Sequence, residues 1–69
     1  MPLTNIESAR LRILKARRHA SDPLSDEWLE ALRPRLERLV GEAQAEKLIA
    51  EELGRLKWRR RSAVEALAE

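Results

Sequence analysis

The sequence contains no cysteine, a single histidine, and neither phenylalanine nor tyrosine. Without cysteine the chain can form neither a disulfide nor a thiolate zinc site. Because His19 stands alone, the usual cluster of nitrogen ligands is missing as well, and we expect no metal and no other cofactor. A cysteine-free composition also fits a reducing compartment, so we expect a cytoplasmic protein.

Long apolar runs are missing too, and none approaches the ~20 residues that a membrane-spanning helix needs. Arg10, Arg12 and Lys15 interrupt the apolar stretches that a secretory signal peptide would require. Residues 9–20 are rich in arginine and free of acidic residues, which imitates a mitochondrial transit peptide. Glu7 and the scarcity of serine speak against that interpretation. We therefore expect no membrane association.

The chain has 69 residues, enough for one small domain. The core of such a chain alone rarely contributes more than ~3–5 kcal/mol, so small domains usually need disulfides, a metal or a partner. With the first two excluded, a second copy of the chain is the remaining source of stability. We therefore expect a homo-oligomer, and specifically a homodimer.

Glycine and proline are scarce, with two and three residues, while Leu, Ala, Glu and Arg are abundant. This composition is typical of helices, and no segment alternates apolar and polar residues as a half-buried strand would. We predict an all-α, three-helix domain over residues 1–69, made of a helical hairpin and a long C-terminal helix. The helices should cover about 5–20, 25–40 and 42–68.

The first helix should begin at a capping box, "TNIE", in which Thr4 and Glu7 bond each other's backbone N–H groups. The apolar stripe that follows has the spacing of an amphipathic helix. It consists of Ile6, Ala9, Ile13, Ala16 and Ala20, widened by Leu11 and Leu14.

A turn at Asp22-Pro23 should end that helix, and Ser25 should cap the second. Pro34 lies inside the second apolar pattern, which continues past it, so we expect a kink and not a break. Gly41 has the position of a helix-ending glycine. The predicted core face is Trp28, Leu32, Leu36, Leu39 and Ala43.

The third helix carries an apolar seam with spacings of three and four residues, close to a heptad pattern. The spacing crosses Gly54 without a change of phase, so we predict one continuous helix. Arg60 interrupts the seam and must either find a carboxylate, for example in the second helix of another copy, or lie where the seam frays. We predict a dimer seam formed by Ile49, Leu53, Leu56, Ala63 and Leu67.

Charge is segregated along the chain. Residues 1–20 hold five Lys/Arg and one Glu, net +4; residues 21–53 hold four against nine acidic residues, net −5; residues 54–69 hold five against two, net +3. Two basic patches follow from this distribution. The main one comprises Arg55, Lys57, Trp58, Arg59, Arg60 and Arg61, and the secondary one comprises Arg10, Arg12, Lys15, Arg17 and Arg18.

Trp58 should project about 180° from the seam of a continuous third helix, taking 100° per residue. Exposed and flanked by arginines, it would be a candidate anchor for a protein partner, because Trp and Arg are enriched at binding hot spots. If the helix bent at Gly54 instead, Trp58 could enter the core. The same basic residues could also neutralise nucleic-acid phosphates.

The segment "IAEELGRLKWRRRSAVEAL" resembles a helix-turn-helix motif at Ala50, Leu53 and Gly54. The resemblance implies that Lys57, Arg59 and Arg60 open a recognition helix toward the major groove. The sequence departs from the motif at Arg60, where an apolar residue should lock the second helix.

No combination of residues indicates catalysis. A nucleophile needs an adjacent base, and phosphate binding needs a glycine-rich loop, and the sequence predicts neither. Glu51 and Glu52 are adjacent and should point in different directions on a helix. We expect no enzyme and no small-molecule substrate. We expect a small regulatory or inhibitory module that binds an acidic protein partner, with a DNA-binding regulator as the alternative.

Overall fold

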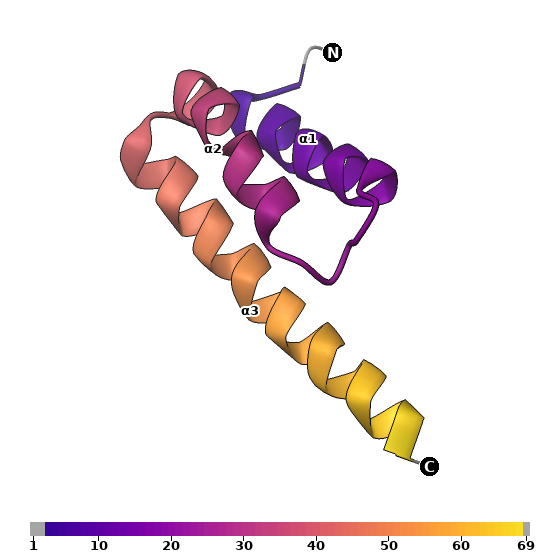
Figure 1. Ribbon diagram of the computed structural model, residues 1–69. Helices are drawn as coiled ribbons and strands as arrows, with labels where there is room; N and C mark the ends of the chain where they lie inside the picture. The colour runs from indigo at the N-terminus through magenta and orange to yellow at the C-terminus, as the bar shows by residue number, and fades with distance from the viewer. Residues whose placement is uncertain (1–2, 69) are drawn as a thin grey trace.

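A computed structural model describes residues 3–68, which form three helices and, within that range, no strand. They are α1 (Asn5–His19), α2 (Glu27–Val40) and α3 (Glu42–Ala68). α2 packs against both of the other helices, while α3 continues well beyond them toward the C-terminus (Figure 1). The prediction of an all-helical chain with a long last helix is confirmed.

α1 begins at the predicted capping box. The Thr4 hydroxyl accepts from the Glu7 N–H at 3.1 Å, and the Glu7 carboxylate accepts from the Thr4 N–H at 3.5 Å. Only part of the predicted apolar stripe is buried, because Ile6 and Leu11 both remain 42% exposed. The helix therefore packs through a narrow face centred on Ala9 and Ile13, the two buried residues of α1.

α2 begins two residues later than predicted, with Asp26 and not Ser25 at the N-cap position. The serine still contributes, because its Oγ accepts from the Glu27 N–H at 3.3 Å. The preceding turn is closed by Asp22, whose carboxylate accepts from the Leu24 N–H and whose carbonyl accepts from the Ser25 N–H, both at 3.1 Å. These local bonds hold Ser25 in the turn and leave the first helical position to Glu27.

Pro34 lies inside α2 and the helix continues to Val40, as the apolar spacing predicted. The Arg33 guanidinium donates to both carboxylate oxygens of Glu30 at 3.1 and 3.2 Å. These hydrogen bonds lower the pKa of the Glu30 carboxyl below its ordinary value of 4.5. Gly41 then ends the helix with φ at 85°, a backbone conformation that favours glycine.

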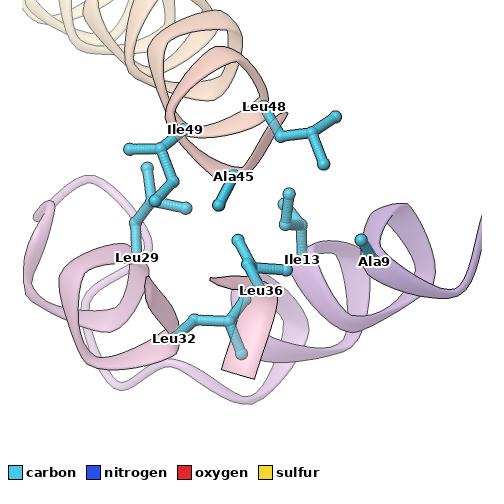
Figure 2. Close-up of a cluster of buried hydrophobic side chains, with 8 residues drawn as sticks. All are labelled: Ala9, Ile13, Leu29, Leu32, Leu36, Ala45, Leu48 and Ile49. Carbon is cyan, nitrogen blue, oxygen red and sulfur yellow. The ribbon is translucent and has the colours of Figure 1, made fainter. Parts of the chain in front are cut away.

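The core lies where all three helices meet (Figure 2). It is formed by Ala9, Ile13, Leu29, Leu32, Leu36, Ala45, Leu48 and Ile49. Leu29, which the predicted core face of the second helix omitted, is fully buried, while Trp28 is half-buried at the edge of the cluster and donates its indole N–H to the Pro23 carbonyl. Ala43 is exposed and belongs to α3, because Gly41 ends α2 before it.

α3 is one helix from Glu42 to Ala68 and runs through Gly54 without interruption. The prediction of continuity is confirmed, and the turn that a helix-turn-helix motif requires at this point is not formed. Gly54 is exposed, and a Cβ added to it would meet nothing within 4 Å.

Candidate protein-binding site

The main basic patch divides into an outer and an inner set of side chains. Trp58 is 70% exposed, and Lys57 and Arg61 are also exposed. Arg59 and Arg60 are half-buried and contact other parts of the chain. Because α3 is continuous, Trp58 lies on the side of the helix opposite Ile49 and Leu56, both of which are buried. The predicted stretch is therefore not one uniform surface.

Arg60 has a partner within the chain. Its Nε–H donates to the carbonyl oxygen of Leu24, in the turn before α2. We expected Arg60 either to pair with a carboxylate or to lie where the seam frays; instead its guanidinium donates to a backbone carbonyl of the same chain. The bond ties the α1–α2 turn to the second half of α3, which accounts for an arginine on the apolar side of that helix.

Glu52 is the centre of a cluster of three guanidinium groups. Its side chain is nearly buried, with a relative exposure of 3% for the residue. Its carboxylate oxygens lie 3.5 Å from Arg17, 3.3 Å from Arg55 and 3.2 Å from Arg59, measured to Nη1 in each case. The cluster joins α1 to α3, because Arg17 belongs to the first helix and the other three residues to the last.

This cluster was not foreseen, although the sequence contains a signal for it. Glu52 follows Ile49 by three residues and precedes Leu56 by four, which places all three on one face of a helix. Since both neighbours are apolar, that face was bound to be buried, and Glu52 with it. Its neighbour Glu51 points outward and lies 3.9 Å from Arg10 of α1.

A cleft between α1 and α3 opens beside this cluster. It has a volume of about 220 Å³, with an apolar wall made by Ile13, Leu14 and Leu48. Its remaining lining is charged and consists of Arg10, Arg17, Arg55, Glu51 and Glu52. The cleft therefore combines guanidinium donors with apolar contact area, as sites that bind an amphipathic ligand do.

The secondary basic patch is also divided by the fold. Arg10 and Arg17 face α3 across the cleft. Arg12 and Lys15 line a separate hollow that they share with Arg35 of α2. Arg18 is exposed near the end of α1. Residues from the two predicted patches thus converge only at the cleft.

The predicted dimer seam has two parts with different surroundings. Ile49 and Leu56 are fully buried within the chain, and Leu53 is half-buried against the core. Beyond Arg60, Ala63 is half-buried and Leu67 is 87% exposed. Val64, which the predicted seam omitted, is 66% exposed beside it.

A metal site would require acidic residues or the histidine to gather in one place. Within residues 3–68, no three His, Asp or Glu side chains are placed so that they could hold a metal ion. His19 borders a hollow at the α1–α2 turn, which it shares with Asp22 and Glu27. Over the same residues, no helix combines the length and the apolar character needed to cross a bilayer.

Comparison of the chain with protein-family models, with curated proteins and with solved structures gave no match. Without a matching family, the chain is described by its own fold and surface. Residues 3–68 form three helices with a projecting last helix, an exposed tryptophan on that helix, and an arginine-lined cleft between α1 and the first half of α3.

Proposed function

We propose that this chain is a non-catalytic, regulatory or inhibitory module that binds an acidic protein partner. The contact surface is the outer face of α3, which carries Lys57, Trp58 and Arg61, together with Arg55 one turn earlier. The observation that carries the proposal is the exposure of Trp58, at 70%, on a face that the chain's own core does not use.

Physical chemistry favours a partner for this residue. A large indole in water forgoes the transfer free energy that burial would provide, and tryptophan and arginine are the residues most enriched at binding hot spots. The surrounding basic side chains would steer an acidic partner toward the indole. Their long stems would also cover apolar area next to it.

We further propose that the chain works as a homodimer through the distal part of α3. Ala63, Val64 and Leu67 continue the core-facing side of this helix beyond the region that α1 and α2 cover (Figure 1). A second copy can cover the same stripe in a symmetric contact. The small core of the chain makes such additional burial valuable.

Selection of displayed peptides tests the binding proposal. A random library of helical peptides is presented to the wild-type chain, and we expect enrichment of sequences that combine Asp and Glu with large apolar residues. The enriched peptides should bind the Trp58→Ala variant at least about thirtyfold more weakly, because a hot-spot truncation costs about 2 kcal/mol or more. Unchanged affinity in that variant would contradict the proposal.

Two controls separate binding from folding. Trp58→Ala should unfold at the same urea concentration as the wild type, since an exposed side chain adds little to the core. Leu11→Ala removes another exposed apolar side chain, on α1, and should leave peptide affinity unchanged. If Trp58→Ala loses stability, the indole belongs to the fold and not to an interface.

A salt titration of binding to random-sequence duplex DNA tests the alternative, a DNA-binding regulator. Lys57 and Arg61 are the exposed basic residues suited to this test, because Arg59 and Arg60 also hold the fold together. DNA would be the target if the affinity of the wild type fell steeply with salt and the slope of log affinity against log salt concentration were smaller by about two in Lys57→Gln/Arg61→Gln. No binding at low salt would leave the protein-partner proposal in place.

A further inference from the structure

We propose that the cleft between α1 and α3 is a recognition site for a carboxylate of the partner together with the apolar side chain next to it. The occupant is an acidic amphipathic segment, most simply a short helix. This inference rests on the proposed function. It adds the cleft to the surface around Trp58 as a second part of the contact with the protein partner.

The charge balance of the cleft favours an anion. Arg10, Arg17, Arg55 and Arg59 surround it or adjoin it, whereas Glu51 and Glu52 supply the only two carboxylates among the described residues that line it. Arg17, Arg55 and Arg59 each use Nη1 toward Glu52, and Arg10 uses Nη2 toward Glu51. A guanidinium has five N–H donors. Donors therefore remain for a further acceptor, and a planar fork suits a carboxylate.

Glu52 gives this arrangement its stiffness. Because its carboxylate is buried and holds three guanidinium groups, the side chains of Arg17, Arg55 and Arg59 are positioned before any ligand arrives. Pre-organised donors lose less side-chain entropy on binding than freely rotating ones. Glu52 is thus a positioning residue, and the arginines make the contact.

The apolar wall points to a peptide and not to a nucleic-acid backbone. The half-buried Leu14 and the accessible edges of the largely buried Ile13 and Leu48 can pack against a Leu or Phe side chain, which a phosphate chain does not offer. The two glutamates in the lining would repel consecutive phosphates, while an isolated carboxylate can be placed away from them. An acidic peptide with interspersed apolar residues matches both features.

The cleft and the tryptophan belong to one continuous surface. Arg55 lines the cleft and precedes Trp58 by three residues, so the two side chains are neighbours along the helix. A partner helix that places its carboxylate at Arg55 can therefore place an apolar residue against Trp58. This geometry predicts apolar and acidic residues at spacings of three and four in the partner.

The experiment measures the affinity of a capped synthetic peptide with Glu and Leu at helical spacing, and of the same peptide with Gln in place of Glu. Binding is followed by calorimetry with the wild type, Arg10→Gln, Leu14→Glu and Trp58→Ala. Arg12→Gln is the matched control, because it removes an arginine from the same helix outside the cleft. Amide chemical shifts of the labelled chain locate the contact.

We expect Arg10→Gln and Leu14→Glu each to weaken binding of the Glu peptide by about tenfold, equivalent to about 1.4 kcal/mol. The affinity of Arg12→Gln for the Glu peptide should stay within about twofold of the wild-type value. The Gln peptide should bind poorly to the wild type and to all of the variants. Chemical-shift changes should include Leu14 and Leu48. The exposed Arg10 side chain can be removed without disturbing the core, so its result stands even if Leu14→Glu folds poorly.

Other outcomes overturn the inference in distinguishable ways. Normal affinity in Arg10→Gln and Leu14→Glu with loss in Trp58→Ala would leave the proposed function intact and remove the cleft from it. Equal affinity of the Glu and Gln peptides would show that the site does not select a carboxylate. Failure of the wild type to bind the Glu peptide, with salt-dependent DNA binding that Arg10→Gln weakens, would overturn both proposals.

Discussion

Glu52 shows at the scale of one residue how a charge can be accommodated in so small a core. Moving a carboxylate out of water is costly unless charged donors replace the lost hydration. Arg17, Arg55 and Arg59 do so while their own side chains remain 31%, 58% and 30% exposed, so the cations keep part of their hydration. The desolvation cost thus falls mainly on one group, and three partners offset it.

Replacing Glu52 by glutamine should therefore lower the free energy of unfolding by about 1–2 kcal/mol, because charge-assisted hydrogen bonds become neutral ones. Urea denaturation measures this change. Glu51→Gln is the matched control, and its cost should stay below about 0.5 kcal/mol, since the pair with Arg10 is exposed. Equal effects of the two variants would mean that the Glu52 cluster adds no specific stability.

α3 is the element on which every proposed contact depends. It contains 27 residues, and at ~1.5 Å per residue it is about 40 Å long, so its distal turns extend past α1 and α2 (Figure 1). Its continuity is maintained although Gly54 lies near the middle, because the apolar spacing is in phase on both sides of it. A helix-turn-helix arrangement would instead need that glycine for a turn.

Gly54→Ala distinguishes these two roles. In a continuous helix the change should raise the free energy of unfolding by about 0.5–1 kcal/mol, and the added Cβ has open space. Urea denaturation and helicity by circular dichroism provide the measurement. Gly41→Ala, at φ 85°, should destabilise and serves as the contrasting control. A loss of stability in Gly54→Ala would mean that α3 is broken at this position.

At the scale of the whole molecule, the buried core is small, and several large apolar side chains lie outside it. The main cluster contains eight buried residues, whereas large apolar side chains at both ends of the chain stay in water. The most exposed of them, Leu67, lies in the last turns of α3. A second copy that covered this stripe would add burial where the monomer has none.

The unfolding midpoint should therefore rise with protein concentration, since association stabilises the folded state by mass action. In Leu67→Glu the midpoint should become independent of concentration while the monomer fold is retained, because this side chain is 87% exposed. Leu11→Glu, on the exposed side of α1, should keep the concentration dependence. A wild-type midpoint that does not move with concentration would mean that the chain is stable as a monomer.

Interactions between residues close in sequence determine the helix boundaries of this protein and the direction of its exposed tryptophan. The capping box at Thr4, the glycine at position 41 and the phase of the apolar residues determine where helices begin, end and continue. The same phase determines that Trp58 points away from the core. These features depend on residues three or four positions apart, and helix geometry relates such residues without reference to the rest of the fold.

Tertiary structure alone decided which charged residues meet. Arg17 and Glu52 are 35 residues apart in the chain, and their charges come to 3.5 Å because α1 and α3 both pack on α2. Arg60 finds the Leu24 carbonyl for the same reason, which no pattern around either residue indicates. Helix periodicity determines the face on which a side chain lies. The partner across that face depends on how the helices cross, which the buried residues of all three helices determine together.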